Sequence, residues 1–275
     1  MSFSLRTLVI TIAAFATMAP VCVLGGGETT TTTATIELGP AAIVEVIGEN
    51  AEVQVLRATS DSLELTATFH NGEFVDFFTQ SLTPDPSSHF VISATISAGG
   101  STTANSIIEL RIPEGMQLVI QTTNRPISIE EAILTSASLT TTNGEISVKN
   151  STGDFDLNTT NSEVTVQSVD GNVNIATTNA HVWFDCIVAA GMNSISTTNG
   201  DIAVRLRDGS NVFISGSTHN GEVTVDGGAS GVTKDGDTAM VELQIADGVA
   251  TLAITNGPGA IYINPETIAV FDGDS

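Results

Sequence analysis

Apolar and polar residues alternate along most of the chain, with the period of a β-strand. The stretches 144–148, 162–166, 200–204 and 221–225 read GEISV, SEVTV, GDIAV and GEVTV. This alternation puts Ile and Val on one face of a strand and Glu, Ser and Thr on the other. A second alternating stretch lies midway between these, as in GDFDL at 153–157. The pattern predicts units of two short strands and two turns.

A short asparagine signature precedes each unit and marks an internal repeat. Five copies read Thr-Thr-Asn, one reads Thr-His-Asn and one reads Ile-Thr-Asn. Successive asparagines are 19, 18, 18, 20, 21 and 36 residues apart. Because 36 is twice 18, we expect that one copy near Asp235-Gly236 has lost its signature, which gives about eight turns. The seven asparagines are Asn124, Asn143, Asn161, Asn179, Asn199, Asn220 and Asn256.

The repeat predicts an all-β fold, a parallel β-solenoid of about eight coils with roughly 18–21 residues each. Coils stacked at about 4.8 Å place like residues above one another, so Thr and Asn can hydrogen-bond along the stack. A meander of hairpins is the competing arrangement, because Asn-Gly between alternating strands is a hairpin signal. The strict period favours the solenoid. Its predicted core is Ile146, Val148, Phe155, Leu157, Val164, Val166, Val173, Ile175, Val182, Phe184, Ile202 and Val204.

Four segments are expected along the chain. Residues 1–25 carry Arg6, an apolar run and a glycine triplet, which is the layout of a secretory signal. Residues 26–35 form a Thr-rich tether, 36–118 an irregular β region that caps the N-terminal end, and 119–275 the repeat solenoid. Two alternatives to cleavage stay open: a lipid on Cys22, and retention of the apolar run as an anchor. All three place the protein outside the cytoplasm, as a secreted, periplasmic or cell-surface protein.

Charge narrows the range of partners. Asp and Glu number 31 against 8 Lys and Arg, which gives a net charge of -23 and a pI near 4.1. Such a surface repels a phosphate backbone, so nucleic-acid binding is excluded. Contact with a membrane is expected only through the N-terminal anchor or lipid.

Candidate chemistry is sparse, and we expect no catalytic, cofactor-binding or metal site. His70, His89, His181 and His219 have no ligand spacing. The acidic turns do not match the calcium-binding Gly-Gly-x-Gly-x-Asp repeat, and a solvated acidic face is the expectation for them. Cys186 is predicted to be a buried, inert thiol. These turns contain Asp154, Asp156, Asp170, Asp185, Asp201, Asp208, Asp226, Asp235 and Asp237.

Two further features are singled out by their residue types. Trp183 lies between the inward residues Val182 and Phe184, so its indole should point outward, where it can stack on a sugar or be covered by a loop. Arg205 and Arg207 are closely spaced bases, and surface pairing with Asp201 and Asp208 is the expected role.

The chain resembles the putative adhesin family, a domain of unknown function in bacterial and archaeal envelope proteins. The resemblance rests on IELRIPEG at 108–115, LVIQTTN at 118–124 and the Thr-Thr-Asn-Gly repeats that follow. It covers roughly residues 36–263. Arg125-Pro126, where the first repeat would carry Gly, and the long step from Asn220 to Asn256 depart from the pattern. The resemblance implies a β-solenoid and an adhesive role.

Three functional hypotheses follow. The first is a non-enzymatic, adhesin-like solenoid that presents a repetitive polar and acidic surface to an envelope protein or a glycan. The second is an envelope structural or regulatory domain that binds only proteins. The third, least favoured, is a polysaccharide-acting β-helix enzyme using the acids with Arg205 or Arg207. The sequence does not identify the ligand or the oligomeric state.

Overall fold

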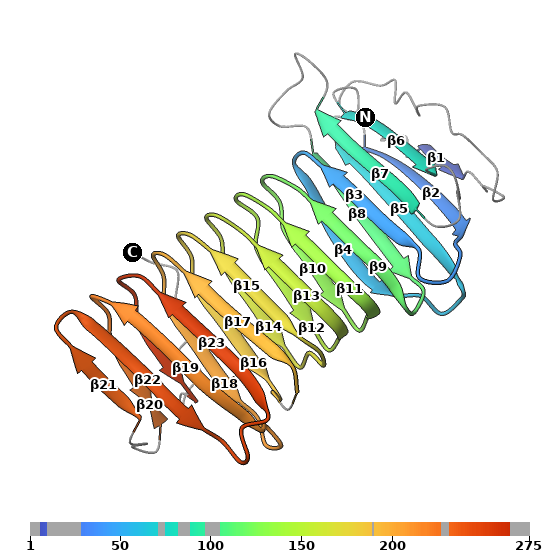
Figure 1. The fold of residues 1–275 in the computed structure, drawn as a ribbon. Helices are drawn as coiled ribbons and strands as arrows, with labels where there is room; N and C mark the ends of the chain where they lie inside the picture. Colours follow the sequence, from blue (N-terminus) through green and yellow to red (C-terminus); the bar gives the residue numbers. More distant parts are fainter. Residues whose placement is uncertain are drawn as a thin grey trace.

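The structure is a computed structural model that describes residues 6–9, 29–70, 75–81, 89–96, 105–188, 190–226 and 231–264. In these ranges the chain forms β-strands joined by turns, which confirms the all-β prediction. Among the described residues, no helix has the length and apolar character needed to cross a membrane. The strands form two 12-stranded sheets that lie face to face along a rod (Figure 1). Most neighbouring strands are parallel.

We refer to the two sheets as sheet A and sheet B. Sheet A consists, in spatial order, of β1 (Arg6–Val9), β2 (Thr29–Glu37), β5 (Ser62–His70), β8 (Asn105–Ile112), β4 (Ala51–Arg57), β10 (Ile127–Glu130), β12 (Ile146–Lys149), β14 (Val164–Gln167), β16 (Val182–Cys186), β18 (Ile202–Leu206), β24 (Ile261–Ile263) and β20 (Val223–Val225). Sheet B consists, in spatial order, of β21 (Val232–Asp235), β22 (Thr238–Gln244), β19 (Val212–His219), β23 (Ala250–Asn256), β17 (Met192–Thr197), β15 (Val173–Thr177), β13 (Thr152–Asn158), β11 (Ile133–Thr140), β9 (Met116–Gln121), β3 (Ile43–Gly48), β7 (His89–Ile96) and β6 (Val75–Ser81).

From β9 to β18 the chain alternates between the sheets, one strand in sheet B and the next in sheet A, and we call each such pair a coil. Each strand pairs in parallel with its equivalent in the next coil, as Val164 lies opposite Ile146 on one side and Val182 on the other. The strands on either side of each Thr-Thr-Asn bend therefore belong to different sheets. The alternative of a hairpin meander does not describe this part of the chain.

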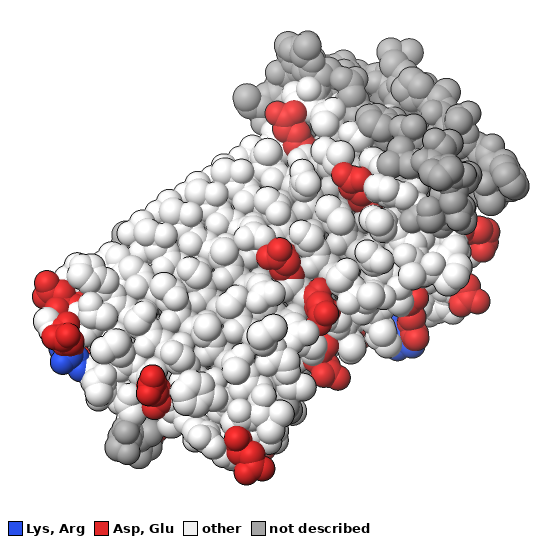
Figure 2. Space-filling view, in the orientation of Figure 1, with Lys and Arg blue, Asp and Glu red and all other residues white. Residues whose placement is uncertain are grey.

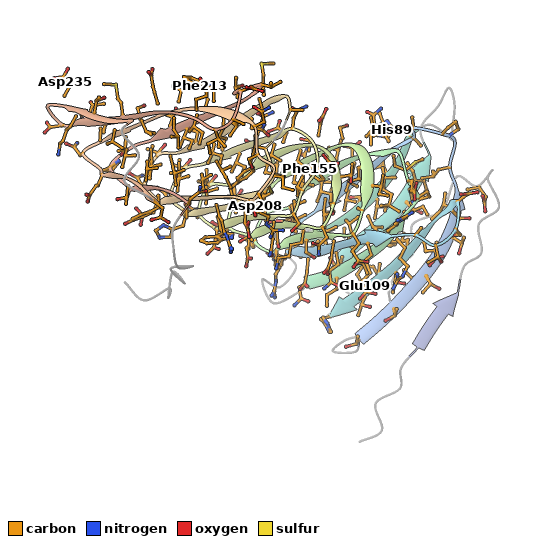
Figure 3. All side chains as sticks on the ribbon, turned by 90° about the horizontal axis from the view of Figure 1, so that it is seen from below. His89, Glu109, Phe155, Asp208, Phe213 and Asp235 are labelled. Atoms are coloured by element: carbon orange, nitrogen blue, oxygen red, sulfur yellow. The ribbon has the colours of Figure 1, made fainter. Side chains whose placement is uncertain are left out.

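The apolar side chains of the two sheets meet in one continuous core. All twelve predicted core residues are buried, with exposed fractions of 0–2%. Figure 3 shows Phe155 between the sheets and Phe213 on the outer side of sheet B. Burial of each Val, Ile, Leu or Phe side chain contributes about 1.5–3 kcal/mol relative to exposure, which makes this core the main source of stability.

The C-terminal coil departs from sequential stacking. Strands β23 and β24 are the last in the chain, yet β23 lies between β17 and β19, and β24 between β18 and β20. The 36-residue step between Asn220 and Asn256 does not contain a coil that lost its signature, so that expectation is wrong. It contains β21 and β22, which pair antiparallel with each other, and β22 also pairs antiparallel with β19.

The N-terminal third contains a matching insertion. Strands β3 and β4 come early in the chain, but β3 lies between β7 and β9, and β4 between β8 and β10. Beyond them, β2 pairs antiparallel with β5, β5 with β8, and β6 with β7. Antiparallel strands thus flank the parallel stack at both ends. Such strands cover backbone groups that an uncapped stack would leave unpaired.

The segment predicted as a signal lies outside the described residues except for β1. This strand pairs in parallel with β2, which begins within the predicted Thr-rich tether, at Thr29. Part of the tether is therefore a strand of sheet A that pairs with β5, and Thr31 hydrogen-bonds Thr68 over 3.1 Å.

Candidate functional site

An asparagine ladder runs along the bend where sheet B strands give way to sheet A strands. From Asn124 to Asn199, the side-chain amide of each asparagine donates to Oδ1 of the asparagine before it in the row, over 2.6–2.9 Å, and Asn50 accepts the bond at the end of the row. A neutral hydrogen bond of this kind contributes about 1 kcal/mol or less when it is exposed. The predicted stacking of asparagines is confirmed for this row. It runs through Asn50, Asn124, Asn143, Asn161, Asn179 and Asn199.

The ladder differs from the sequence pattern at both ends. Asn50 belongs to the ladder because the inserted coil β3/β4 stacks on β9/β10, although two threonines do not precede it in the sequence. Asn256 is not part of the ladder, because the strand register places it opposite Thr197 and Thr218, which are the first threonines of their signatures. Asn256 is accordingly buried, and its amide donates to the carbonyl of Ala260 over 3.1 Å. Equating Ile254-Thr255-Asn256 with the other signatures was wrong by two positions.

The first threonine of each signature lies beneath the ladder and is buried. Thr122 and Thr197 donate from Oγ1 to the carbonyls of Ala51 and Ala180, over 2.9 and 3.0 Å. Both acceptors are backbone groups of the neighbouring coil. These threonines therefore stabilise the bend by bonding to the backbone and not, as predicted, to one another.

The outer face of sheet B is flat and largely uncharged. Figure 2 shows acidic side chains at scattered places on this face, and Asp154 and Asp156 point outward from β13 beside a largely uncharged stretch formed by β15, β17, β23 and β19. The strands there present small polar or apolar side chains in parallel rows, with the intervening residues buried in the core. The outward residues of β15, β17, β23 and β19 include Asn174, Ala176, Ser194, Ser196, Ala253, Thr255, Ser215 and Ser217.

A charged cluster lies at the opposite bend. Arg207 donates to Asp185 from Nε and Nη2, over 2.7 and 2.9 Å, and from Nη1 to Oγ of Ser168 over 2.7 Å. The hydrogen bonds that Arg207 donates to Asp185 raise the pKa of its guanidinium above the ordinary value. Asp185 is buried and Arg207 is about one-third exposed. The predicted surface pairing of Arg205 and Arg207 with Asp201 and Asp208 is therefore replaced, for Arg207, by a bidentate pair with Asp185, whereas Arg205 is exposed.

Two hollows accompany the charged residues, and sequence reasoning found neither. One, of about 600 Å³, is lined by Ser168, Asn172, Ile187, Arg207 and their neighbours. The other, of about 940 Å³, lies at the N-terminal third beside the ion pair of Arg57 with Glu114. Both combine residues from loops of different coils, which no sequence spacing indicates.

Cys186 is buried next to the charged cluster, as predicted. Its Sγ accepts a hydrogen bond from the backbone amide of Val169 at 3.5 Å. Burial is the main cause that raises the pKa of the thiol from 9.0 to about 11. A thiol in this environment stays protonated and unreactive at neutral pH.

This pKa shift predicts a loss of stability at high pH. Because the pKa of Cys186 is higher in the folded chain, the unfolded chain loses its proton first as pH rises from about 9 to about 11. Each pKa unit corresponds to about 1.4 kcal/mol. The free energy of unfolding of the wild type, measured by denaturant titration, should therefore fall more steeply over this pH window than that of Cys186→Ala. Parallel pH profiles for the two proteins would contradict the shift.

The four histidines lie at separate places, each beside a different partner. His89 Nε2 is 2.9 Å from Glu45 Oε2, and His181 Nδ1 accepts from the backbone amide of Asp201 over 2.9 Å. His70 contacts Thr29, and His219 contacts Thr238. Within the described residues, no group of three or more His, Cys, Asp or Glu side chains is placed to hold a metal ion. The absence of a metal site stays a prediction.

The excess of acidic residues predicts a response to salt. With a net charge of -23 the folded rod repels itself, and salt screens this repulsion within about 10 Å at 0.1 M. Thermal melts should therefore shift upward as monovalent salt rises from a few millimolar toward about 1 M. Calcium should add little beyond magnesium at equal ionic strength. A sharp gain at micromolar calcium, absent with magnesium, would identify the acidic turns as metal sites.

These features define an all-β protein with two parallel stacks of strands, a polar outer face and a bend tied by asparagines. No family model matches the chain, and no curated protein matches it. A crystal structure of a putative adhesin from Parabacteroides distasonis is similar, with TM-score 0.50 and 10% identity over 86% of this chain and 98% of that one. A putative cell adhesion protein from Clostridium sporogenes (TM-score 0.42, 9% identity, 86% and 99% coverage) and a putative lipid binding protein from Parabacteroides distasonis (TM-score 0.35, 11% identity, 85% and 96% coverage) were also found.

Proposed function

We propose that the protein is a non-enzymatic, extracytoplasmic β-solenoid of the putative adhesin kind, and that it binds an envelope or extracellular ligand. The observation that carries the proposal is the flat outer face of sheet B, where small uncharged side chains repeat from strand to strand (Figure 2). A repetitive row of hydrogen-bonding groups suits a repetitive ligand or an extended partner surface. The adhesin name of the Parabacteroides distasonis structure agrees with this role.

The domain division and the export route belong to the same proposal. Residues 36–118 contribute the N-terminal cap and 119–275 the repeat body, preceded by a signal at 1–25; of the tether expected at 26–35, the part from Thr29 belongs to strand β2. Fractionation with intact-mass analysis tests the export. A chain outside the cytoplasm that begins near Gly26 is expected. Acyl chains on Cys22 or a retained N-terminus would establish the lipid or the anchor instead.

A binding screen tests the function. The secreted chain is offered to arrays of glycans and of cell-surface proteins, with and without calcium. Ser194→Arg and Ser215→Arg place a bulky charge on the outer face of sheet B and should abolish binding of the ligand found. Thr66→Arg, on the outer face of sheet A in β5 and far along the rod from β16, is the matched control. Binding to proteins alone would favour the structural or regulatory alternative, and binding to no ligand would contradict the proposal.

A further inference from the structure

The only tryptophan and the only tyrosine of the chain lie on one row of the outer face of sheet A. Trp183 on β16 is opposite Ala203 on β18, and Ala203 is opposite Tyr262 on β24. The two rings belong to distant parts of the sequence. They share a row because the C-terminal coil is inserted directly beside β18.

Ala203 shows that large side chains cover the space between the two aromatic residues. It is 3% exposed, although it faces outward on the sheet. Ala176 and Ala253 also face outward, on sheet B, but their neighbours on adjacent strands are small or polar, and both are exposed. Trp183 is half-buried, and Tyr262 keeps 37% of its surface exposed. The row therefore presents an apolar surface that spans three adjacent strands, with its aromatic parts still open to solvent.

Polar groups border this surface on its sides. On one side lie His181 and Asp201, where Asp201 Oδ1 accepts from the backbone amide of Ala260 over 2.7 Å and Oδ2 is 3.7 Å from His181 Nδ1. On the other side Arg205 lies opposite Asp185 and is exposed. The row continues beyond both aromatic residues: Thr165 on β14 lies next to Trp183, and Thr224 on β20 lies next to Tyr262.

We propose that the row Trp183, Ala203 and Tyr262 binds the sugar rings of an uncharged polysaccharide. This inference goes beyond the proposed function, because it places its ligand on the outer face of sheet A, whereas the proposed function is carried by the outer face of sheet B. A pyranose ring has an apolar face that stacks on an indole or phenol ring, and hydroxyl groups at its edge that bond to flanking polar groups. The apolar row with carboxylate, imidazole, guanidinium and hydroxyl groups around it matches both parts of such a ligand.

Charge and spacing narrow the ligand further. The chain carries -23, so an anionic polysaccharide or a nucleic acid is repelled even though nucleobases can also stack on aromatic rings. The two aromatic residues are two strand spacings apart, about 10 Å. One sugar chain crossing the strands can therefore contact both rings through different sugar units. A monosaccharide reaches one ring only and should bind more weakly than a hexamer.

Fluorescence titration of the full chain tests the proposal, because its single tryptophan reports directly on the site. The probes are neutral hexasaccharides of glucose, mannose and xylose, with hexagalacturonate as the acidic comparison. At least one neutral hexamer should shift the emission of Trp183, and hexagalacturonate should not. Tyr262→Ala should weaken binding about tenfold. Phe213→Ala is the matched control, because Phe213 is equally exposed, at 37%, on the outer face of sheet B (Figure 3).

The outcomes separate this inference from the proposed function. Binding of a hexamer that Tyr262→Ala leaves unchanged, or weakens no more than Phe213→Ala, would place the sugar elsewhere and overturn the site. If the screen finds protein ligands but no neutral hexamer binds, the inference is overturned and the proposed function still stands. Preferential binding of hexagalacturonate would also overturn it. Circular dichroism of both variants verifies that the fold is retained, as expected for outward residues.

Discussion

Val166→Asp is expected to abolish the cooperative unfolding of the central coils. Val166 is fully buried between the sheets, opposite Val148 and Phe184 on the adjacent strands. A carboxylate there has no partner and displaces packed apolar atoms, which costs about 4 kcal/mol or more. Val164→Asp should have the same effect for the same reason. Chemical denaturation followed by circular dichroism measures the loss.

The matched controls are the outward residues of the same strand and bend. Glu163 and Thr165 are half-exposed, and Thr165 Oγ1 donates to Glu163 Oε1 over 3.1 Å. Replacing either with alanine removes a solvent-accessible hydrogen bond, so the free energy of unfolding should change by about 0.5 kcal/mol or less. Equal tolerance at the inward and outward positions would refute the assignment of faces.

Arg207→Ala is expected to have the second largest effect. It removes both hydrogen bonds to Asp185, whose side chain is only 4% exposed, and so leaves a buried carboxylate without its partner. Breaking a buried ion pair in this way costs about 3 kcal/mol, at the low end of the usual range because Arg207 itself is partly exposed. The free energy of unfolding from urea titrations at pH 7 measures it.

Arg205→Ala is the control for this prediction. It removes the same charge two positions away, from a side chain that is exposed on the outer face of sheet A. Its effect on stability should be within about 0.5 kcal/mol. The double variant Arg207→Ala with Asp185→Asn should recover part of the loss, because the unpaired charge is gone. Similar losses for Arg205→Ala and Arg207→Ala would show that the pair with Asp185 is not what stabilises this bend.

The stacking of the asparagines and the burial of the apolar rows share a physical origin. Parallel strands in register place equivalent residues of successive coils one strand spacing apart, about 4.8 Å. At that distance an asparagine amide reaches the carbonyl oxygen of the next one, and branched apolar side chains pack directly on each other. The ladder ends at Asn199 because the next coil in space, β23/β24, has Pro258 in the bend, two residues after the buried Asn256.

The sequence by itself determined the local structure of the repeats. Alternation of period two separated inward from outward residues correctly at every predicted core position, because one face of each strand must leave water. The asparagine signature located five of the six ladder positions, since the bend requires the same side chain in each coil. The outward direction of Trp183 followed from the same alternation, and the burial of Cys186 was expected from its residue type.

Only the tertiary structure decided the order in which the coils stack. Periodicity constrains a strand and its immediate bends, but any coil with matching apolar rows can occupy any level of the stack, and loop closure over longer distances adds little cost. The chain therefore inserts β3/β4 and β23/β24 out of sequence, and β21 and β22 fill the long step that the repeat count had assigned to a coil. The pairing of Arg207 with Asp185 and the meeting of Trp183 with Tyr262 follow from contacts between coils, which no spacing along the chain encodes.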